Sequence, residues 1–386
     1  MQSLDDFATG KLAALERANL RRRLVETRRT EGTAVTRNGR ALISFCCNDY
    51  LNLSQHGVVI EAAIEALRRH GVGAGASRLI TGNHPLFAEL ETRLARLKGT
   101  ADAMVFGSGY LANAGIVPAL IGRHGLILID ELSHACLWTG TRLARGTVLT
   151  FRHNDVDHAR ALLAAHRHRH NQAMIATDGV FSMDGDLAPL PALSTLAREY
   201  DAWLLTDDAH GLGVIGDGRG SSFAHGIPVD VPLQMGTLSK AIGGYGGYLC
   251  ASRPVIELLR NRARTFVYST GLPPAMVAAA IAALDVIESN PDYAGRPLRK
   301  ARAFTRQLGL PEATSPIVPI VLGSAERAMA AARMLEDEGF LIAAIRPPTV
   351  PEGTARLRIT FSAAHSDAAV ERLAAMVRDN ILAAAS

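Results

Sequence analysis

The sequence predicts an α/β protein that has a large domain with a doubly wound, mostly parallel sheet, and a smaller α+β C-terminal domain. Two observations predict this fold class. Short, continuously apolar segments alternate with stretches of helical periodicity, which is typical of a parallel sheet covered on both faces. The length of 386 residues also exceeds what one hydrophobic core accommodates. The composition is 48% hydrophobic and 20% charged, which excludes collagen-like and disordered proteins.

The expected elements begin with an N-terminal arm over residues 1–48. From Lys11 to Arg29 the pattern is helical and strongly charged, and it leads into a short strand near residues 41–45. Residues 49–275 form the expected large domain. Apolar runs predict its strands over residues 103–106, 126–130, 147–151, 173–178, 203–207, 233–236 and 248–251.

The small domain is expected to span residues 276–386. The chain breaks at Ser-Thr-Gly-Leu-Pro-Pro, residues 269–274, and enters a long Ala-rich helix that runs toward Glu288. Because few strands follow, the pattern favours a compact lid or clamp. The predicted elements are helices over 297–308, 325–338 and from about 367, and strands over 316–322, 340–345 and 356–361.

Charge and cysteine usage exclude several classes of partner. The net charge is +4, and arginines near the N-terminus, including Arg21, hold much of the excess. Because no RNA-binding aromatic motif, zinc-finger spacing or basic zipper accompanies them, we expect small anionic ligands and no nucleic acid. The four cysteines form no C-x-x-C pair, so neither a disulfide framework nor a metal site is expected. No signal peptide or membrane-spanning apolar run is recognisable, which favours a cytoplasmic protein without a membrane partner.

A glycine-rich turn follows the expected strand 103–106. Residues 107–112 read Gly-Ser-Gly-Tyr-Leu-Ala, and Asp130 ends the next strand, so the pattern also meets a dinucleotide-binding fingerprint. A helix N-terminus with small residues offers free backbone N–H groups to a phosphate. The sequence leaves three alternatives open here: a dinucleotide site, another phosphate site, or a tight turn.

Three ionisable side chains follow other strands, where ligands of doubly wound sheets bind. Lys240 lies among small residues and glycines, where a desolvated amine can act as a nucleophile, although a surface lysine is the simpler interpretation. Asp207 ends an apolar strand, where a carboxylate needs a cationic partner unless it only caps a helix. His134 is either a structural residue or a flat acid–base group. One cofactor, pyridoxal 5'-phosphate, explains all three together with a phosphate cradle at Gly109 and Tyr110.

Longer motifs carry a resemblance to a known family. They are Asn-Asp-Tyr-Leu at 48–51, Ser-His-Ala at 133–135, the acidic and glycine-rich segments 178–186 and 207–216, and Thr-Leu-Ser-Lys at 237–240. From about residue 19 to the C-terminus, the chain resembles the α-oxoamine synthases. These are fold-type I pyridoxal-phosphate enzymes that condense an amino acid with an acyl-CoA and release carbon dioxide. The resemblance implies the same fold, cofactor and homodimeric assembly here.

The resemblance also implies roles for individual residues. Lys240 would hold the cofactor, Asp207 would pair with its pyridinium nitrogen, His210 would bond its phenolic oxygen, and His134 would stack on its ring. The remaining contacts implied for the cofactor are Gly109, Tyr110 and Thr237 at the phosphate, Ser182 at the ring edge, and Thr270 of a second subunit. The implied substrate contacts are Arg358 and Asn48 at the amino-acid carboxylate, His134 above the substrate, Thr349 in the acyl site, and Arg21 at the distal carboxylate of the acyl chain.

The segment 345–360 resembles family members that join L-alanine to a pimeloyl thioester in biotin synthesis. The resemblance therefore implies L-alanine and pimeloyl-CoA or pimeloyl-acyl carrier protein as substrates. Another reaction of the family, such as acetyl transfer to glycine, is the alternative. A nucleotide-dependent oxidoreductase and an inert scaffold are rivals from other classes. The sequence departs from the family at Cys136, where serine is usual, and at Ala74 and Ala76 in a stretch where glycine is common.

Overall fold

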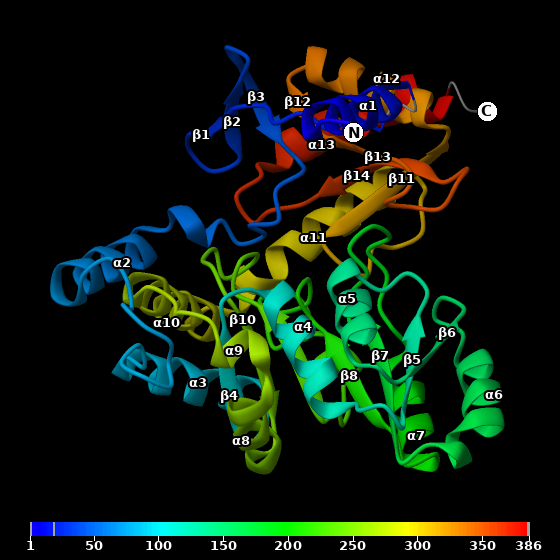
Figure 1. The fold of residues 1–386 in the computed structure, drawn as a ribbon. Helices are drawn as coiled ribbons and strands as arrows, with labels where there is room; N and C mark the ends of the chain where they lie inside the picture. Colours follow the sequence, from blue (N-terminus) through cyan, green and yellow to red (C-terminus); the bar gives the residue numbers. More distant parts are fainter. Residues whose placement is uncertain (1, 18–19, 384–386) are drawn as a thin grey trace.

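The computed structural model describes residues 2–17 and 20–383, and a seven-stranded sheet forms its centre (Figure 1). The strand order is β4-β10-β9-β8-β7-β5-β6. Strands β5 to β9 are parallel, while β10 is antiparallel to both of its neighbours, so the predicted mostly parallel sheet is confirmed. The strands are β4 (Asp102–Phe106), β5 (Gly125–Asp130), β6 (Thr147–Phe151), β7 (Gln172–Asp178), β8 (Trp203–Asp207), β9 (Leu233–Thr237) and β10 (Gly247–Ala251).

Helices cover both faces of this sheet because successive side chains of its strands point to opposite sides. In β5, Leu126 and Leu128 pack into one hydrophobic cluster, whereas Ile127 and Ile129 pack into another on the opposite face. The helices of this part are α2 (Gly57–His70), α3 (Pro85–Lys98), α4 (Gly109–Leu120), α5 (Ala135–Leu143), α6 (Val156–His166), α7 (Leu190–Glu199), α8 (Arg253–Arg262), α9 (Arg264–Val267) and α10 (Pro274–Ser289). Short helical turns cover Leu53–Gln55, Arg167–Arg169 and Ser221–Phe223.

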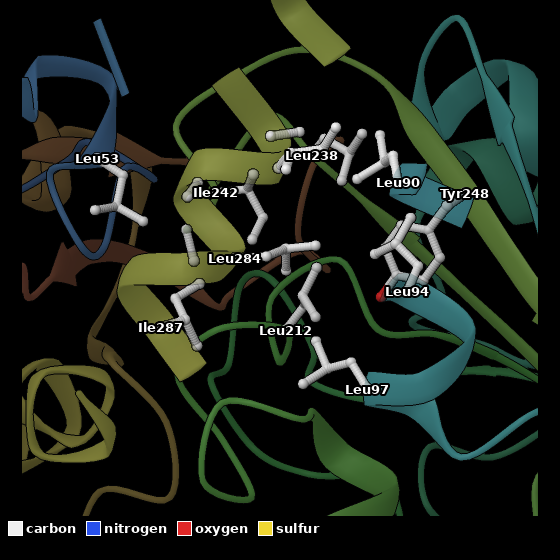
Figure 2. Close-up of a cluster of buried hydrophobic side chains, with 14 of the residues drawn as sticks. Leu53, Leu90, Leu94, Leu97, Leu212, Leu238, Ile242, Tyr248, Leu284 and Ile287 are labelled. Carbon is white, nitrogen blue, oxygen red and sulfur yellow. The ribbon is translucent and has the colours of Figure 1, made fainter. Parts of the chain in front are cut away.

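Helix α10 packs into the hydrophobic core of the larger unit. Figure 2 shows Leu284 and Ile287 of α10 beside Leu212, in a cluster that also holds Leu90 and Leu94 of α3. The division expected from the sequence, 49–275 and 276–386, stays a prediction. The burial of α10 against α3 favours a boundary after Ser289.

The smaller unit has its own core around a three-stranded antiparallel sheet of order β11-β14-β13. Its elements are α11 (Pro291–Gln307), β11 (Ile317–Gly323), α12 (Ala325–Asp337), β12 (Phe340–Leu341), β13 (Ala343–Ile345), β14 (Ala355–Thr360), α13 (Asp367–Val377) and a final turn, Arg378–Leu382. Apart from α11, which begins six residues before the predicted start at 297, these elements lie within a few residues of the predicted ones. No helix within residues 2–17 and 20–383 is long and apolar enough to cross a membrane.

The N-terminal arm differs from the expected helix over Lys11–Arg29. Helix α1 spans Leu4–Arg17 and buries no residue, and β1 (Thr27–Arg29) pairs with β2 (Ala34–Arg37). The prediction of helix through residue 29 was wrong because backbone pairing with β2 replaces it. Strand β3 (Arg40–Ser44), close to the predicted strand, pairs with β12, so this segment is joined to the smaller unit.

Candidate active site

A cavity of about 250 Å³ lies beyond the carboxyl ends of β7, β8 and β9. The register of the sheet places Asp178 and Asp207 side by side at these ends. Seven predicted cofactor residues line the cavity: Gly109, Tyr110, His134, Asp207, His210, Thr237 and Lys240. The structure therefore brings together side chains that are up to 131 residues apart in sequence, from Gly109 to Lys240.

Asp207 is almost completely buried and is held by neutral donors. Its carboxylate accepts hydrogen bonds from the Asn113 side-chain amide (2.7 Å), the Ala209 backbone N–H (3.0 Å) and the Cys136 thiol (3.5 Å). None of the described residues forms an ion pair with it. A buried carboxylate without a cation is costly, so this geometry suits a cationic ligand atom.

Lys240 and His210 form the opposite side of the cavity. The Lys240 amine lies 2.7 Å from His210 Nε2, and His210 Nδ1 lies 2.6 Å from the Tyr50 hydroxyl. Burial lowers the pKa of Lys240 to about 8, against the opposing effect of Asp207. Burial and the nearby Lys240 also hold the pKa of His210 well below its ordinary value. His210 is therefore uncharged at neutral pH, whereas Lys240 loses its charge as the pH rises through about 8.

His134 stands at the start of α5, where its ring caps the helix. The ring Nδ1 accepts the Cys136 backbone N–H at 3.3 Å. The backbone N–H of His134 donates to the Asp178 carboxylate at 3.1 Å. Burial lowers the pKa of His134, so the ring is neutral at physiological pH. Burial and the charge of Asp207 raise the pKa of Asp178 well above its ordinary range.

The glycine-rich turn forms the start of α4 beside β9. Ser108 caps the helix by accepting the Leu111 N–H at 3.2 Å. A Cβ atom on Gly109 would lie 3.2 Å from Met235 and 3.3 Å from Thr237, so only glycine leaves this approach open. Free backbone N–H groups at a helix start bind anions, so this end of the cavity suits a phosphate.

A second, larger cavity of about 640 Å³ shares His134 with the first. Leu132, Trp138, Phe181, Met183 and Val350 are among the apolar side chains that line it. Ser182 and Thr349 lie on its wall, so Ser182 faces this space and does not line the smaller cavity. An elongated, mostly apolar ligand portion fits such a lining.

Arg358 is buried on β14 and reaches toward the loop after β7. Its guanidinium donates to the Ser182 carbonyl oxygen and to Asn48 Oδ1, the latter at 3.2 Å. The structure therefore joins two predicted carboxylate-binding residues, Arg358 and Asn48. Asn48, the Ser182 carbonyl group and Arg358 come from three separate segments. Because Arg358 lies on β14, the smaller unit contributes to this contact.

Four predicted site residues line neither cavity: Asn48 and Arg358, which contact each other, and Arg21 and Thr270. The Arg21 guanidinium bonds Glu16 at 3.2 Å and is 41% exposed, while its neighbour Arg22 lines the larger cavity and donates to Thr349 at 3.4 Å. Thr270 is exposed and pairs with Ser77, outside the smaller cavity of this chain. Arg21 lines neither cavity, and Arg22 takes the place beside Thr349 that was predicted for Arg21. The roles of Arg21 and Thr270 stay predictions.

Sequence reasoning missed three residues of the site. Asn113 lies inside α4 without any motif, and its contact with Asp207 arises only in the fold. Tyr50 stands within the Asn-Asp-Tyr-Leu motif, which was a usable signal, but it was given no role. Arg22 belongs to an exposed run of arginines whose orientation no periodicity predicts.

Comparisons with known proteins show the family and the fold of this chain. The model of the family "aminotransferase class I and II" matches residues 40–377. An 8-amino-7-oxononanoate synthase of Methylocella silvestris is 64% identical, covering 89% of this chain and 98% of its own length. One from Beijerinckia indica is 60% identical over 98% of each chain. A solved serine palmitoyltransferase variant from S. paucimobilis, with a bound PLP–myriocin aldimine, has a TM-score of 0.90 at 28% identity, covering 97% of this chain and 96% of that one.

The fold and the site define a pyridoxal-phosphate-dependent enzyme of fold type I. The dinucleotide alternative for residues 107–112 loses its support, because β4 before that turn is an antiparallel edge strand. The chain belongs to the aminotransferase class I and II family and, within it, to the 8-amino-7-oxononanoate synthases.

The residues of the smaller cavity fit pyridoxal phosphate on structural grounds. The buried Asp207 carboxylate forms no ion pair with any described residue, and a pyridinium nitrogen would supply the missing cationic partner. The Ser133 hydroxyl is buried without a hydrogen-bond partner at the same edge of the sheet, next to His134. A Cβ at Gly109 would narrow the cradle between α4 and β9.

Proposed function

We propose that this chain condenses L-alanine with a pimeloyl thioester to give 8-amino-7-oxononanoate, carbon dioxide and the free thiol. The observation that carries this proposal is the partly desolvated Lys240 amine across one cavity from buried Asp207, with an apolar cavity adjoining at His134. The names of relatives that are 60–64% identical support the substrates. We further propose that the protein works in the cytoplasm.

Individual residues would hold the cofactor as follows. Lys240 would bond it covalently, Asp207 would pair with its ring nitrogen, and His210 would donate to its ring oxygen. Gly109, Tyr110 and Thr237 would bind its phosphate, and His134 would lie on the ring. When bound, pyridoxal phosphate supplies an electron sink for negative charge that develops at the substrate Cα.

The chain's own groups would then bind and orient the substrates. Arg358, with Asn48, would hold the alanine carboxylate, because a guanidinium matches a carboxylate in shape and charge. Lys240, with a pKa of about 8, would take the proton from Cα once the substrate amine has replaced it. Ser182 and His134 lie at the junction of the two cavities, where the amino acid meets the acyl chain.

The acyl-transfer step balances with one proton from solvent. A bond forms between the alanine Cα and the thioester carbonyl carbon, and the carbon–sulfur bond breaks to release a thiolate, which takes that proton to become the free thiol. The bond from Cα to the carboxylate then breaks with loss of carbon dioxide, and Lys240 would return a proton to Cα. The apolar lining of the larger cavity would receive the acyl methylenes, with Thr349 on its wall.

We also propose that the active protein is a homodimer in which Thr270 of the partner subunit reaches the phosphate. Exposed apolar side chains near this segment support it: Val72 is 81%, Ile80 76% and Tyr268 71% exposed. The Ala76 carbonyl oxygen accepts the Gly271 N–H at 3.0 Å, so these segments lie together on one face. Sedimentation of the wild type against Ile80→Asp tests this: the variant should shift toward monomer, whereas a monomeric wild type would contradict it.

The function is tested with purified enzyme loaded with pyridoxal phosphate. L-Alanine with pimeloyl-CoA or pimeloyl-acyl carrier protein should yield 8-amino-7-oxononanoate and carbon dioxide, and the two donors are compared side by side. Glycine with acetyl-CoA is the control for the alternative reaction of the family. Faster turnover of glycine and acetyl-CoA would replace the proposed substrates while leaving the cofactor chemistry in place.

A further inference from the structure

Three side chains form a continuous chain of hydrogen bonds that leads from the protein interior to the cavity. The Tyr50 hydroxyl lies 2.6 Å from His210 Nδ1, and His210 Nε2 lies 2.7 Å from the Lys240 amine. Tyr50 is fully buried and His210 is 5% exposed, so water does not compete for the contact between them, whereas Lys240 is half-buried. The direction of the first hydrogen bond therefore decides which histidine nitrogen carries the proton.

The acceptors around Tyr50 identify its hydroxyl as the donor to His210. Burial raises the pKa of Tyr50 to about 12, so the hydroxyl keeps its proton and needs an acceptor. An unprotonated His210 Nδ1, at 2.6 Å, is the nearer acceptor. The other acceptor within reach, Asn48 Oδ1, is 3.4 Å away and already accepts from Arg358.

The remaining proton of the neutral ring must then be on Nε2. Burial and the nearby Lys240 lower the pKa of His210, so the ring carries only one N–H. An Nε2–H can donate to the Lys240 nitrogen only when that nitrogen has a free lone pair. If Lys240 were an ammonium group at this distance of 2.7 Å, its hydrogens would face the Nε2–H, and two donors would oppose each other.

We propose that Tyr50 is a positioning residue that holds His210 as its Nε2–H tautomer and thereby favours the unprotonated amine of Lys240. The same tautomer presents a donor to the oxygen of the cofactor ring. What the free amine does in catalysis rests on the proposed function, whereas the tautomer does not depend on any substrate.

Other ionisable groups also act on this chain, and the proposal concerns the part that Tyr50 adds. Lys240 is influenced by Asp207 and Asp178, which favour its ammonium form, and by Arg358, which opposes it; Cys136 is also near. His210 is influenced by Lys240, Arg358 and His134. None of these groups donates to His210 Nδ1, so the tautomer depends on Tyr50 among the described residues.

The tautomer is measured directly by nitrogen NMR of the full chain labelled at histidine. The His210 signals are assigned as those missing from a His210→Gln variant. We expect the bare-nitrogen signal at Nδ1 and the N–H signal at Nε2. The reverse assignment in the wild type would overturn the proposal, and this result needs neither turnover nor a folded Tyr50 variant.

The effect on Lys240 is measured with Tyr50→Phe, which removes one oxygen atom. Pyridoxal phosphate is added to the cofactor-free full chain, and the rate at which visible absorbance develops is followed against pH. Because the pKa of Lys240 is about 8, we expect the midpoint near pH 8 in the wild type. It should move upward by up to about one pH unit in the variant, because one hydrogen bond of the chain is lost. An unchanged midpoint would contradict the role of Tyr50.

Tyr293→Phe is the matched control. Its hydroxyl donates to the Leu51 carbonyl oxygen at 2.7 Å, next to Tyr50 in sequence, but it does not touch His210. Loss of this bond should leave the midpoint unchanged, and an equal shift in both variants would mean a general effect of loosening this segment.

A double variant tests whether Tyr50 acts through His210. In Tyr50→Phe/His210→Gln, the shifts of the midpoint should not add, because Tyr50 acts only through His210. Additive shifts would also overturn the proposal.

Discussion

The two adjoining cavities are built in different ways. The smaller one lies at the ends of parallel strands, and its carboxylates are buried and held by backbone or amide donors, as at Asp207. The larger one is assembled from loops and the N-terminal arm, with exposed side chains such as Arg22 and Thr349. In the proposed function, the sheet would therefore position the groups that act on the amino acid, while the connecting segments would shape the space for the acyl group.

The largest expected effect on activity comes from removing the Lys240 amine of the smaller cavity. Lys240→Ala should lower kcat by at least about a thousandfold, because one group supplies both the covalent attachment and the base. The visible absorbance of the bound cofactor should also change. The measurement is turnover of L-alanine with pimeloyl-CoA beside an absorbance spectrum. Alanine-dependent turnover at the wild-type rate would exclude the proposed role.

A smaller loss is expected when the buried carboxylate is replaced by an amide. Asp207→Asn keeps the shape and the bond to Asn113 but removes the charge, so kcat should fall by roughly a hundredfold. Titrating pyridoxal phosphate into the variant distinguishes weaker binding of the cofactor from a slower chemical step. Asp201→Asn, exposed at the other end of the sheet, is the control. Equal kcat in both variants would show that the charge of Asp207 is dispensable.

The larger cavity should instead respond in substrate affinity. Since Arg22 lines the larger cavity, we propose that it binds the distal carboxylate of the acyl chain. Arg22→Ala should then raise KM for pimeloyl-CoA about tenfold and leave kcat nearly constant, because a charge-assisted hydrogen bond would be lost. Arg21→Ala is the matched comparison, since Arg21 pairs with Glu16 at the surface. A rise confined to Arg21→Ala would favour the role predicted from the sequence. That result would mean that the arm turns differently when the substrate is bound.

The same contrast explains what could be predicted from the sequence. The strands and the strand-end residues Lys240, Asp207 and His134 were predictable, because apolar runs specify buried strands and parallel strands end at one edge. The arm was not, because its arginines show no apolar periodicity and β1 forms only by pairing with β2. The contact between Asn113 and Asp207 was also hidden, since it joins residues 94 apart.

The smallest expected effect concerns the loop after β7, which carries Phe181 and Ser182 into the larger cavity. His153 lies 3.1 Å from Asp130 and 2.9 Å from Asp186, and its ring meets Phe181 edge-on. Burial alone would lower the pKa of His153. The hydrogen bonds and charges of both carboxylates outweigh burial and raise this pKa from 6.5 to about 10. The protonated ring therefore ties this loop to the end of β5.

The sign of the pH dependence follows from this raised pKa. Between pH 6.5 and about 10 the folded chain holds a proton on His153 that the unfolded chain has released. The stabilisation is therefore fully present below pH 6.5 and is lost as the pH rises through about 10. Because Asp186 is partly open to solvent, His153→Gln should cost only about 1 kcal/mol of unfolding free energy at pH 6.

Denaturant unfolding of the wild type and His153→Gln across this pH range checks the prediction. The two curves should converge near pH 10, while His158→Gln, whose ring accepts the Arg152 N–H at 3.0 Å, should show no such convergence. KM for pimeloyl-CoA should rise a few-fold in His153→Gln, with KM for alanine less affected, because the loop borders the acyl space. A constant difference in stability from pH 6 to 10 would mean that His153 contributes packing against Phe181 and no charge.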